Sequence, residues 1–365
     1  MKITKVETIV VNLPMVIEGS VVPQQAGRPR TSMDILLVRV DTDVGVCGWG
    51  EGFGHRIFPA TRAALDTLVG PMCLGRDPTA IDALADDLQR NLAGVGRNGP
   101  AMYALSAIDI ALWDIAGKLA GLPLYRLLGG APRERLPAYA SLLRYGEPGA
   151  VAHHVEKALK RGYREIKLHE ITASPIQAAR NAAGPGVAIM VDCNCAWTVA
   201  DAIDMARKLK PLNLKWLEEP VWPPEDHAGL ARVQSEGGIP TAAGENAMLP
   251  EFKGLLAAGA VSYAQPSVTK VGGVTQMRKV AALAQAHGVA VVPHSAYFGP
   301  GLIASIHCIA AVTGEGLVER YDADFAVNPM HGAILPGADG CLAVPQGPGL
   351  GIDPDPAVIA TLRVG

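Results

Sequence analysis

Three acidic residues each follow directly on an apolar run, at similar distances along the chain. Asp192, Glu218 and Glu245 are separated by 26 and 27 residues. Carboxylates that lie close together without a counter-charge repel one another, and a divalent cation removes that cost. Ligation by oxygen alone suits magnesium or manganese. We therefore predict that these acids hold one Mg²⁺ ion, with Mn²⁺ as the alternative.

Zinc is the alternative metal to consider, because Cys193 and Cys195 flank Asn194 just after Asp192. The chain has six cysteines but no CxxC pair, and no second cysteine pair that could complete a zinc site. The sequence thus favours an oxygen-ligated cation.

Possible proton carriers lie at the ends of other apolar runs. Lys167 and His169 are two residues apart, so in a strand their side chains share one face. A lysine that faced a layer of helices would be buried without a partner, which favours the interior for both. His294 ends a later run, on the opposite side of the expected barrel. A base on each side of a metal-bound carbon suits proton abstraction and return.

The elements that would position these residues repeat about every 25 residues. We predict eight strands, each followed by a helix, at 136–141, 165–169, 187–192, 214–218, 240–245, 261–266, 289–294 and 317–319. Eight such units in series are typical of a closed (β/α) barrel of the TIM type. Such a barrel collects the carboxyl ends of its strands on one face, where active sites form.

The first third of the chain has a different pattern and predicts an α+β region. Strands are expected at 2–13 and 35–41, with a glycine-rich turn and strand at 45–54. Helical patterns cover 61–68, 80–92 and 101–119, the last ended by Gly121 and Pro123.

Composition limits the classes of partner. Hydrophobic residues make up 49% of the 365 residues and the net charge is −3, so a large core is expected, without general attraction to nucleic acid or to an anionic membrane. The N-terminus lacks the apolar core of a signal peptide. The uncharged stretch 295–314 is broken by glycine and proline and contains His307, so we expect a buried helix at 302–312, inside the protein or at a subunit contact. Reduced cysteines in the cytoplasm are the expectation.

Several motifs together resemble one known family. They are AIDIALWD at 107–114, LLGG at 127–130, IKLH at 166–169, VDCN at 191–194, WLEEP at 216–220, GEN at 244–246, QP at 265–266, KVGG at 270–273 and PH at 293–294. Over nearly its whole length the chain resembles the mandelate racemase/muconate lactonizing enzyme group of the enolase superfamily. The GEN motif resembles the mandelate-racemase branch, since the other branch usually has aspartate there.

This resemblance implies a domain organisation and a set of substrate contacts. It implies an α+β capping domain at 1–130, a barrel at 131–325 and a C-terminal segment at 326–365 that returns to the capping domain. Two capping loops, 18–31 and 50–60, would shape specificity. Their candidate contacts are Arg28, Arg30, His55 and Arg56. The residues implied for substrate within the barrel are Lys167, Asn194, Ser267, Lys270 and Glu319.

Two departures from the family pattern bear on the reaction. The usual Lys-x-Lys is Lys167-Leu168-His169 here, so His169 takes the place of a lysine base. An unperturbed histidine has a pKa of about 6.5 and is largely neutral near pH 7. The aspartate that usually orients the histidine of the seventh strand is Ser267, so His294 lacks its carboxylate partner, although a serine hydroxyl can still fix one tautomer.

The sequence therefore predicts an enzyme that removes the α-proton of a small carboxylate through an enolate. Our leading hypothesis is dehydration of a hydroxy acid or sugar acid with His169 as the base; His294 as the base is the alternative. Two other functions stay open, racemisation or epimerisation at the α-carbon, and carboxylate binding without catalysis. The resemblance also implies a homo-oligomer, a dimer or an octamer.

Overall fold

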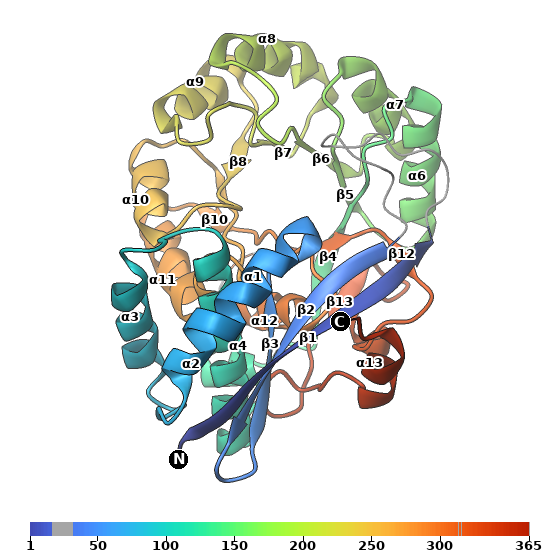
Figure 1. The fold of residues 1–365 in the computed structure, drawn as a ribbon. Helices are drawn as coiled ribbons and strands as arrows, with labels where there is room; N and C mark the ends of the chain where they lie inside the picture. Colours follow the sequence, from blue (N-terminus) through green and yellow to red (C-terminus); the bar gives the residue numbers. More distant parts are fainter. Residues whose placement is uncertain (17–31, 313, 315, 365) are drawn as a thin grey trace.

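The computed structural model describes residues 1–16, 32–312, 314 and 316–364. Its N-terminal part is an antiparallel sheet of β1 (Ile3–Val16), β2 (Ser32–Thr42) and β3 (Cys47–Gly52), which β12 (Asp324–Phe325) joins beside β1 (Figure 1). The α+β prediction is confirmed. Arg28, Arg30 and the first capping loop lie outside the described residues.

The sheet packs against α4 (Pro100–Ala120), the longest helix of the N-terminal part. The others are η1 (His55–Ile57), α1 (Phe58–Ala64), η2 (Leu65–Val69), α2 (Gly70–Cys73), α3 (Ile81–Leu92) and α5 (Leu124–Leu127). The helix α4 ends as predicted, because Gly121 adopts the left-handed conformation with φ of 66°.

The glycine-rich segment before residue 54 allows β3 to lie directly against α4. A Cβ on Gly48 would lie 2.0 Å from the carbonyl oxygen of Ala111, and one on Gly50 would lie 2.0 Å from that of Ala107. A side chain at either position would force strand and helix apart, so the glycines set the interval between these two elements.

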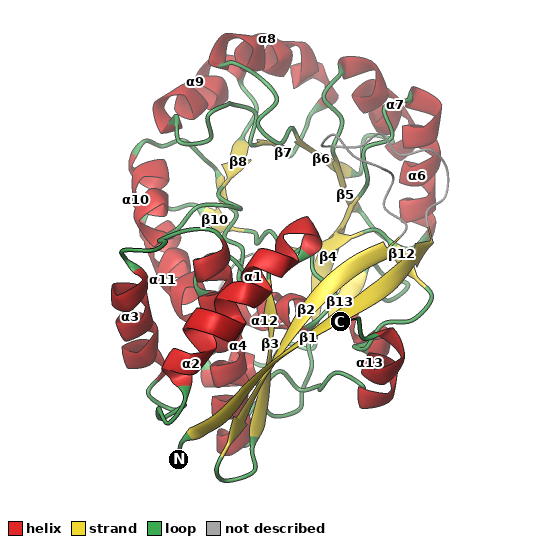
Figure 2. Cartoon of the chain, viewed as in Figure 1, coloured by secondary structure: helices red, strands yellow, loops and turns green. Residues whose placement is uncertain are grey.

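Eight parallel strands in the described part of the chain curl into a TIM-type barrel (Figure 2). Their order is β10-β9-β8-β7-β6-β5-β4-β11. The bounds are β4 (Arg135–Ser141), β5 (Glu165–Leu168), β6 (Ala188–Asp192), β7 (Trp216–Glu218), β8 (Thr241–Ala243), β9 (Tyr263–Ala264), β10 (Ala290–Val291) and β11 (Val318–Tyr321).

The predicted eight strands are thus confirmed, but several of their ends are corrected. The ladder stops at Ala243, Ala264 and Val291, before Glu245, Ser267 and His294. The backbone leaves the sheet early; Gly244, for example, has φ of +123°. These three polar residues therefore lie in the segments that follow their strands.

The barrel closes between β10 and β11 through a side chain. No strand ladder joins these two elements in the described residues. Instead the Ser295 amide donates to Glu319 Oε2 at 2.8 Å and the Ser295 hydroxyl donates to the Glu319 carbonyl at 2.8 Å. Glu319 is therefore also a structural link across the seam.

A ring of helices surrounds the barrel (Figure 1). They are α6 (Pro148–Lys160), α7 (Ala173–Ala183), α8 (Val199–Leu209) with η3 (Lys210–Leu212), α9 (His227–Gly237), α10 (Leu249–Ala257), α11 (Gly273–Ala286) and α12 (Pro300–Ala311). The buried helix expected at 302–312 is α12, whose residues 300–310 are all buried. Within the described residues, no helix is both long and apolar enough to cross a membrane.

The C-terminal segment contacts both parts of the molecule. It contains η4 (His331–Ile334), β13 (Cys341–Ala343) and α13 (Pro356–Leu362). The strand β13 pairs antiparallel with β4 of the barrel, and the Val364 amide donates to Val10 of β1. The boundaries at 130 and 325 stay a prediction.

Candidate metal centre and active site

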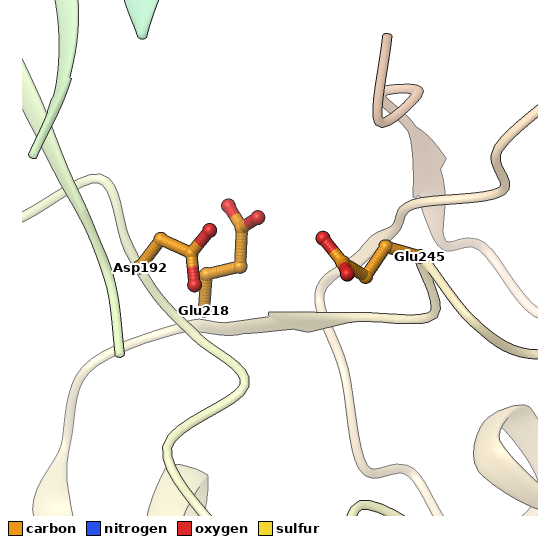
Figure 3. A group of neighbouring side chains, drawn as sticks. All are labelled: Asp192, Glu218 and Glu245. Atoms are coloured by element: carbon orange, nitrogen blue, oxygen red, sulfur yellow. The ribbon is translucent and has the colours of Figure 1, made fainter. Parts of the chain in front are cut away.

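The three acids predicted to hold a cation come together at the carboxyl end of the barrel. Asp192 and Glu218 are the last residues of β6 and β7, and Glu245 follows β8. One carboxylate oxygen from each lies within 4.8 Å of the others (Figure 3). Asp192 and Glu218 are buried, and the Glu245 side chain is 17% exposed.

Neighbouring groups orient each of these carboxylates. The Asn194 backbone and side-chain amides both donate to Asp192 Oδ1 at 2.9 Å. The Trp216 indole donates to Glu218 Oε2 at 2.9 Å, and the Asn246 amide donates to Glu245 Oε1 at 2.9 Å. These hydrogen bonds orient the three carboxylates. The second oxygen of each contacts Lys167, His169 or His294. The substrate contact expected of Asn194 stays a prediction.

Lys167 lies among the acids inside the barrel. Its ammonium is 2.8 Å from Glu218, 2.9 Å from Glu319 and 3.3 Å from Asp192. Burial by itself would lower the pKa of Lys167, but the surrounding carboxylates, Glu218 foremost, outweigh it and raise that pKa well above its usual value. The interior face predicted for Lys167 is confirmed, and its charge is permanent near neutral pH.

One ammonium does not neutralise the cluster. Burial and the charge of Asp192 raise the pKa of Glu218 well above its usual value. Burial opposes ionisation of Glu245 as well, but Lys270 and His294 lower its pKa to about 2. A buried group of three carboxylates is an environment that a divalent cation stabilises, and the all-oxygen donor set fits Mg²⁺.

Glu219 is buried beside the cluster without being part of it. Its Oε1 accepts a hydrogen bond from the Gly244 amide at 3.4 Å, and burial raises its pKa to about 8. The potential ligand group found in the described residues contains Glu218 and leaves out Glu219.

His169 reaches the cluster from the side of β5. Its Nε2 is 3.3 Å from Asp192 Oδ2, and its Nδ1 is 2.5 Å from the Leu142 carbonyl oxygen. A carbonyl can only accept, so Nδ1 carries the proton in the neutral ring and Nε2 keeps its lone pair. The basic nitrogen therefore points at the metal centre.

His294 reaches the cluster from the other side, since β10 and β5 lie across the barrel from each other (Figure 2). Its Nε2 is 3.2 Å from Glu245 Oε2, and its Nδ1 is 3.3 Å from the hydroxyls of both Ser267 and Tyr297. Burial lowers the pKa of His294, and Glu245 partly offsets this effect. A hydroxyl can donate or accept, so both tautomers of His294 have a partner.

The residues expected to contact the far part of the substrate lie toward the capping domain. Lys270 Nζ is 2.9 Å from Asn246 Oδ1, 3.4 Å from Glu245 Oε1, and 4.3 Å from the centre of the Phe53 ring. The His55 ring lies 5.1 Å from the same phenylalanine. The structure thus brings Lys270 to the metal centre. The His55 ring instead contacts Phe53, the ring that Lys270 also faces.

Sequence reasoning missed Tyr297, Trp216 and Phe53. Tyr297 supplies the hydroxyl pair with Ser267 that takes the place of the family's aspartate beside His294. Its only signal was the spacing of three residues after His294. Trp216 lies two residues before Glu218 on β7, so the two side chains share one face of the strand. Strand periodicity could therefore have assigned Trp216 to the interior.

Comparison with known proteins agrees with this architecture. Residues 11–129 match the family described as mandelate racemase/muconate lactonizing enzyme, N-terminal domain, and residues 150–358 match the enolase C-terminal domain-like family. The chain therefore belongs to the mandelate racemase/muconate lactonizing enzyme family of the enolase superfamily.

Relatives within this family carry sugar-acid names. The chain is 34% identical to D-galactarolactone cycloisomerase of Agrobacterium fabrum, over 87% of this chain and 88% of the relative. It is 30% identical to arabinonate dehydratase of Saccharolobus solfataricus, over 87% of this chain and 88% of that protein. The solved structure of L-talarate dehydratase from Polaromonas sp. JS666, complexed with Mg and L-glucarate, has a TM-score of 0.86 and 30% identity, covering 100% of this chain and 98% of that one. The chain is thus similar to dehydratases and cycloisomerases.

Proposed function

We propose that this enzyme removes the α-proton of a hydroxy acid or sugar acid with the help of Mg²⁺ and then expels the β-hydroxyl as water. The observation that carries the proposal is the placement of His169 and His294 on opposite sides of one buried carboxylate cluster, each with Nε2 toward it. The names of the dehydratase relatives support the same chemistry.

Binding comes first. The Lys167 ammonium lies between Glu218 and Glu319, and we assign it to the carboxylate of the substrate. Lys270, with Phe53 and His55 of the N-terminal part, is proposed to bind the rest of the substrate. A divalent cation held by Asp192, Glu218 and Glu245 would supply the positive charge that stabilises the developing enolate.

His169 then takes the α-proton on Nε2. Its bond to the Leu142 carbonyl selects the tautomer that is ready to accept a proton. Asp192 Oδ2 lies 3.3 Å from Nε2. His294 in its protonated form donates to the departing hydroxyl from the other side, and the hydroxyls of Ser267 and Tyr297 accommodate the ring before and after the transfer.

A second candidate is ring opening by the same elimination. If the leaving oxygen belongs to a ring, its loss releases no water and the product is an isomer of the substrate. The cycloisomerase names of two relatives favour this possibility. Both candidates require the same proton abstraction, so they differ in the substrate and not in the site.

The test is a screen of hydroxy acids, sugar acids and their lactones with Mg²⁺ in deuterium oxide. Dehydration yields a product lighter by one water, and ring opening yields an isomer with a new double bond or ketone. Exchange of the α-proton with no elimination product would instead indicate racemisation or epimerisation. Metal binding without exchange on any acid would refute the proposal in favour of a carboxylate-binding protein.

A further inference from the structure

Glu51, at the end of β3, connects the N-terminal sheet to the loop that carries His294. Its side chain is buried, with 5% exposure. Its Oε2 accepts hydrogen bonds from the Gly301 amide at 2.8 Å and the Gly299 amide at 3.1 Å, at the start of α12. Burial raises the pKa of Glu51 to about 7, and the backbone hydrogen bonds at the start of α12 partly offset this effect.

The chain leaves room for this contact by placing glycines around the carboxylate. A Cβ on Gly299 or on Gly301 would lie 2.9 Å from Glu51 Oε2. Real Cβ atoms do not approach an oxygen this closely, so a side chain at either position would displace the carboxylate. The contact of Glu51 with the start of α12 therefore requires glycine at both positions.

The segment that Glu51 holds follows His294 by only a few residues. Tyr297 lies between them, and its hydroxyl contacts both His294 Nδ1 and Ser267. The loop has little other regular structure, since β10 ends at Val291 and α12 begins at Pro300. Glu319 holds the start of this loop at Ser295, and Glu51 holds its end at Gly299 and Gly301.

We propose that Glu51 is a positioning residue for proton transfer by His294, acting through the loop that runs from His294 to Gly301. This inference rests on the proposed function, in which His294 delivers the proton to the leaving group. It gives the N-terminal sheet a part in catalysis, because Glu51 of β3 helps to position the loop that carries His294.

Asp114 of α4 provides a matched control. It is also a buried carboxylate that accepts two backbone hydrogen bonds, from Trp49 at 2.9 Å and Leu350 at 2.8 Å, and it pairs in addition with Lys118 at 2.9 Å. Trp49 belongs to the same strand as Glu51, but neither donor belongs to the His294 loop. The Asp114→Asn variant therefore alters a buried carboxylate at Trp49 and Leu350 and leaves the contacts of Glu51 with Gly299 and Gly301 in place.

The experiment compares Glu51→Gln, Gly299→Ala and Asp114→Asn with the parent enzyme, all loaded with Mg²⁺. We expect kcat to fall about 10- to 100-fold in the first two variants, with little change in KM or in Mg²⁺ affinity, because small displacements of a proton donor slow the chemical step. Amide hydrogen exchange should quicken at 298–301 in both. Asp114→Asn should lose stability and keep kcat, with faster exchange near residues 49 and 350.

Two results would overturn the inference. One is a Glu51→Gln enzyme whose kcat falls no more than that of Asp114→Asn. The other is faster exchange at 298–301 in Gly299→Ala with no loss of kcat, which would make the clamp purely structural. Absence of α-proton exchange by the parent on every acid tested would overturn the proposed function itself, and is distinguishable because it appears before any variant is made.

Discussion

At the scale of single residues, two neighbouring acids at the end of β7 have different environments. Glu218 points into the carboxylate cluster beside Lys167, whereas Glu219 turns toward the Gly244 amide. The difference arises because β7 ends at Glu218 and the backbone turns at Glu219, which has φ of 40°.

We therefore predict that Glu218→Gln weakens Mg²⁺ binding and abolishes turnover, with the fold intact. Calorimetric titration with Mg²⁺ measures the affinity, and circular dichroism checks the fold. Glu219→Gln is the control and should retain most of the affinity. Loss of the metal in Glu219→Gln but not in Glu218→Gln would mean that the assignment of ligands is wrong by one residue.

The two histidines should also separate two steps of the reaction. His169→Asn removes the imidazole whose tautomer is set by the Leu142 carbonyl. The variant should bind Mg²⁺ normally, but its rate of α-proton exchange should fall by a factor of about 100 or more. His294→Asn should keep exchange and fail to form the product. Deuterium incorporation into recovered substrate measures this, and exchange at the parent rate in His169→Asn alone would reverse the assignment.

At the scale of elements, buried carboxylates of the N-terminal part bind the start of barrel helices. Asp109 of α4 accepts from the Thr275 amide of α11 at 3.0 Å, while its Oδ2 has no hydrogen-bond partner among the described residues. Gly273 makes this contact possible, since a Cβ there would lie 2.2 Å from Asp109 Oδ1.

This arrangement predicts a pH dependence of stability. Burial, partly offset by hydrogen bonds from Thr275, raises the pKa of Asp109 from 3.8 to about 7. The folded state therefore holds a proton that the unfolded state has lost between these values, so the contribution of Asp109 to the free energy of unfolding falls as pH rises from about 4 to 7 and is constant above that.

Asp109→Asn cannot lose a proton and should lack this part of the pH dependence. Urea denaturation at several pH values measures it, as the difference in the free energy of unfolding between variant and parent. We expect that difference to grow in favour of the variant as pH rises toward 7. A difference that is independent of pH would show that Asp109 is ionised throughout.

At the scale of the whole molecule, several large apolar side chains are exposed on the single chain, including Val95 at 70% and Trp222 at 69%. The family resemblance points to association with further copies of this chain. We predict a homo-oligomer, a dimer or an octamer. Sedimentation analysis at micromolar concentration tests it, and a monomer there would refute the prediction.

The sequence by itself determined the barrel, the N-terminal sheet and the three acids. These features follow from local periodicity: apolar runs recur with a strand-and-helix spacing, and Asp192, Glu218 and Glu245 mark where those runs end. Parallel strands in a barrel must end on one face, so the cluster could be derived without coordinates.

Tertiary structure alone decided how the histidines are held and where the loops are anchored. The Tyr297 hydroxyl lies beside His294, where the family usually has an aspartate. Glu51 accepts a hydrogen bond from Gly299, which is 248 residues further along the chain. These contacts depend on how distant backbone segments approach, which no local pattern encodes. For the same reason the strand ends at Glu245 and His294 were placed wrongly, since the geometry of the following turns sets where the ladder stops.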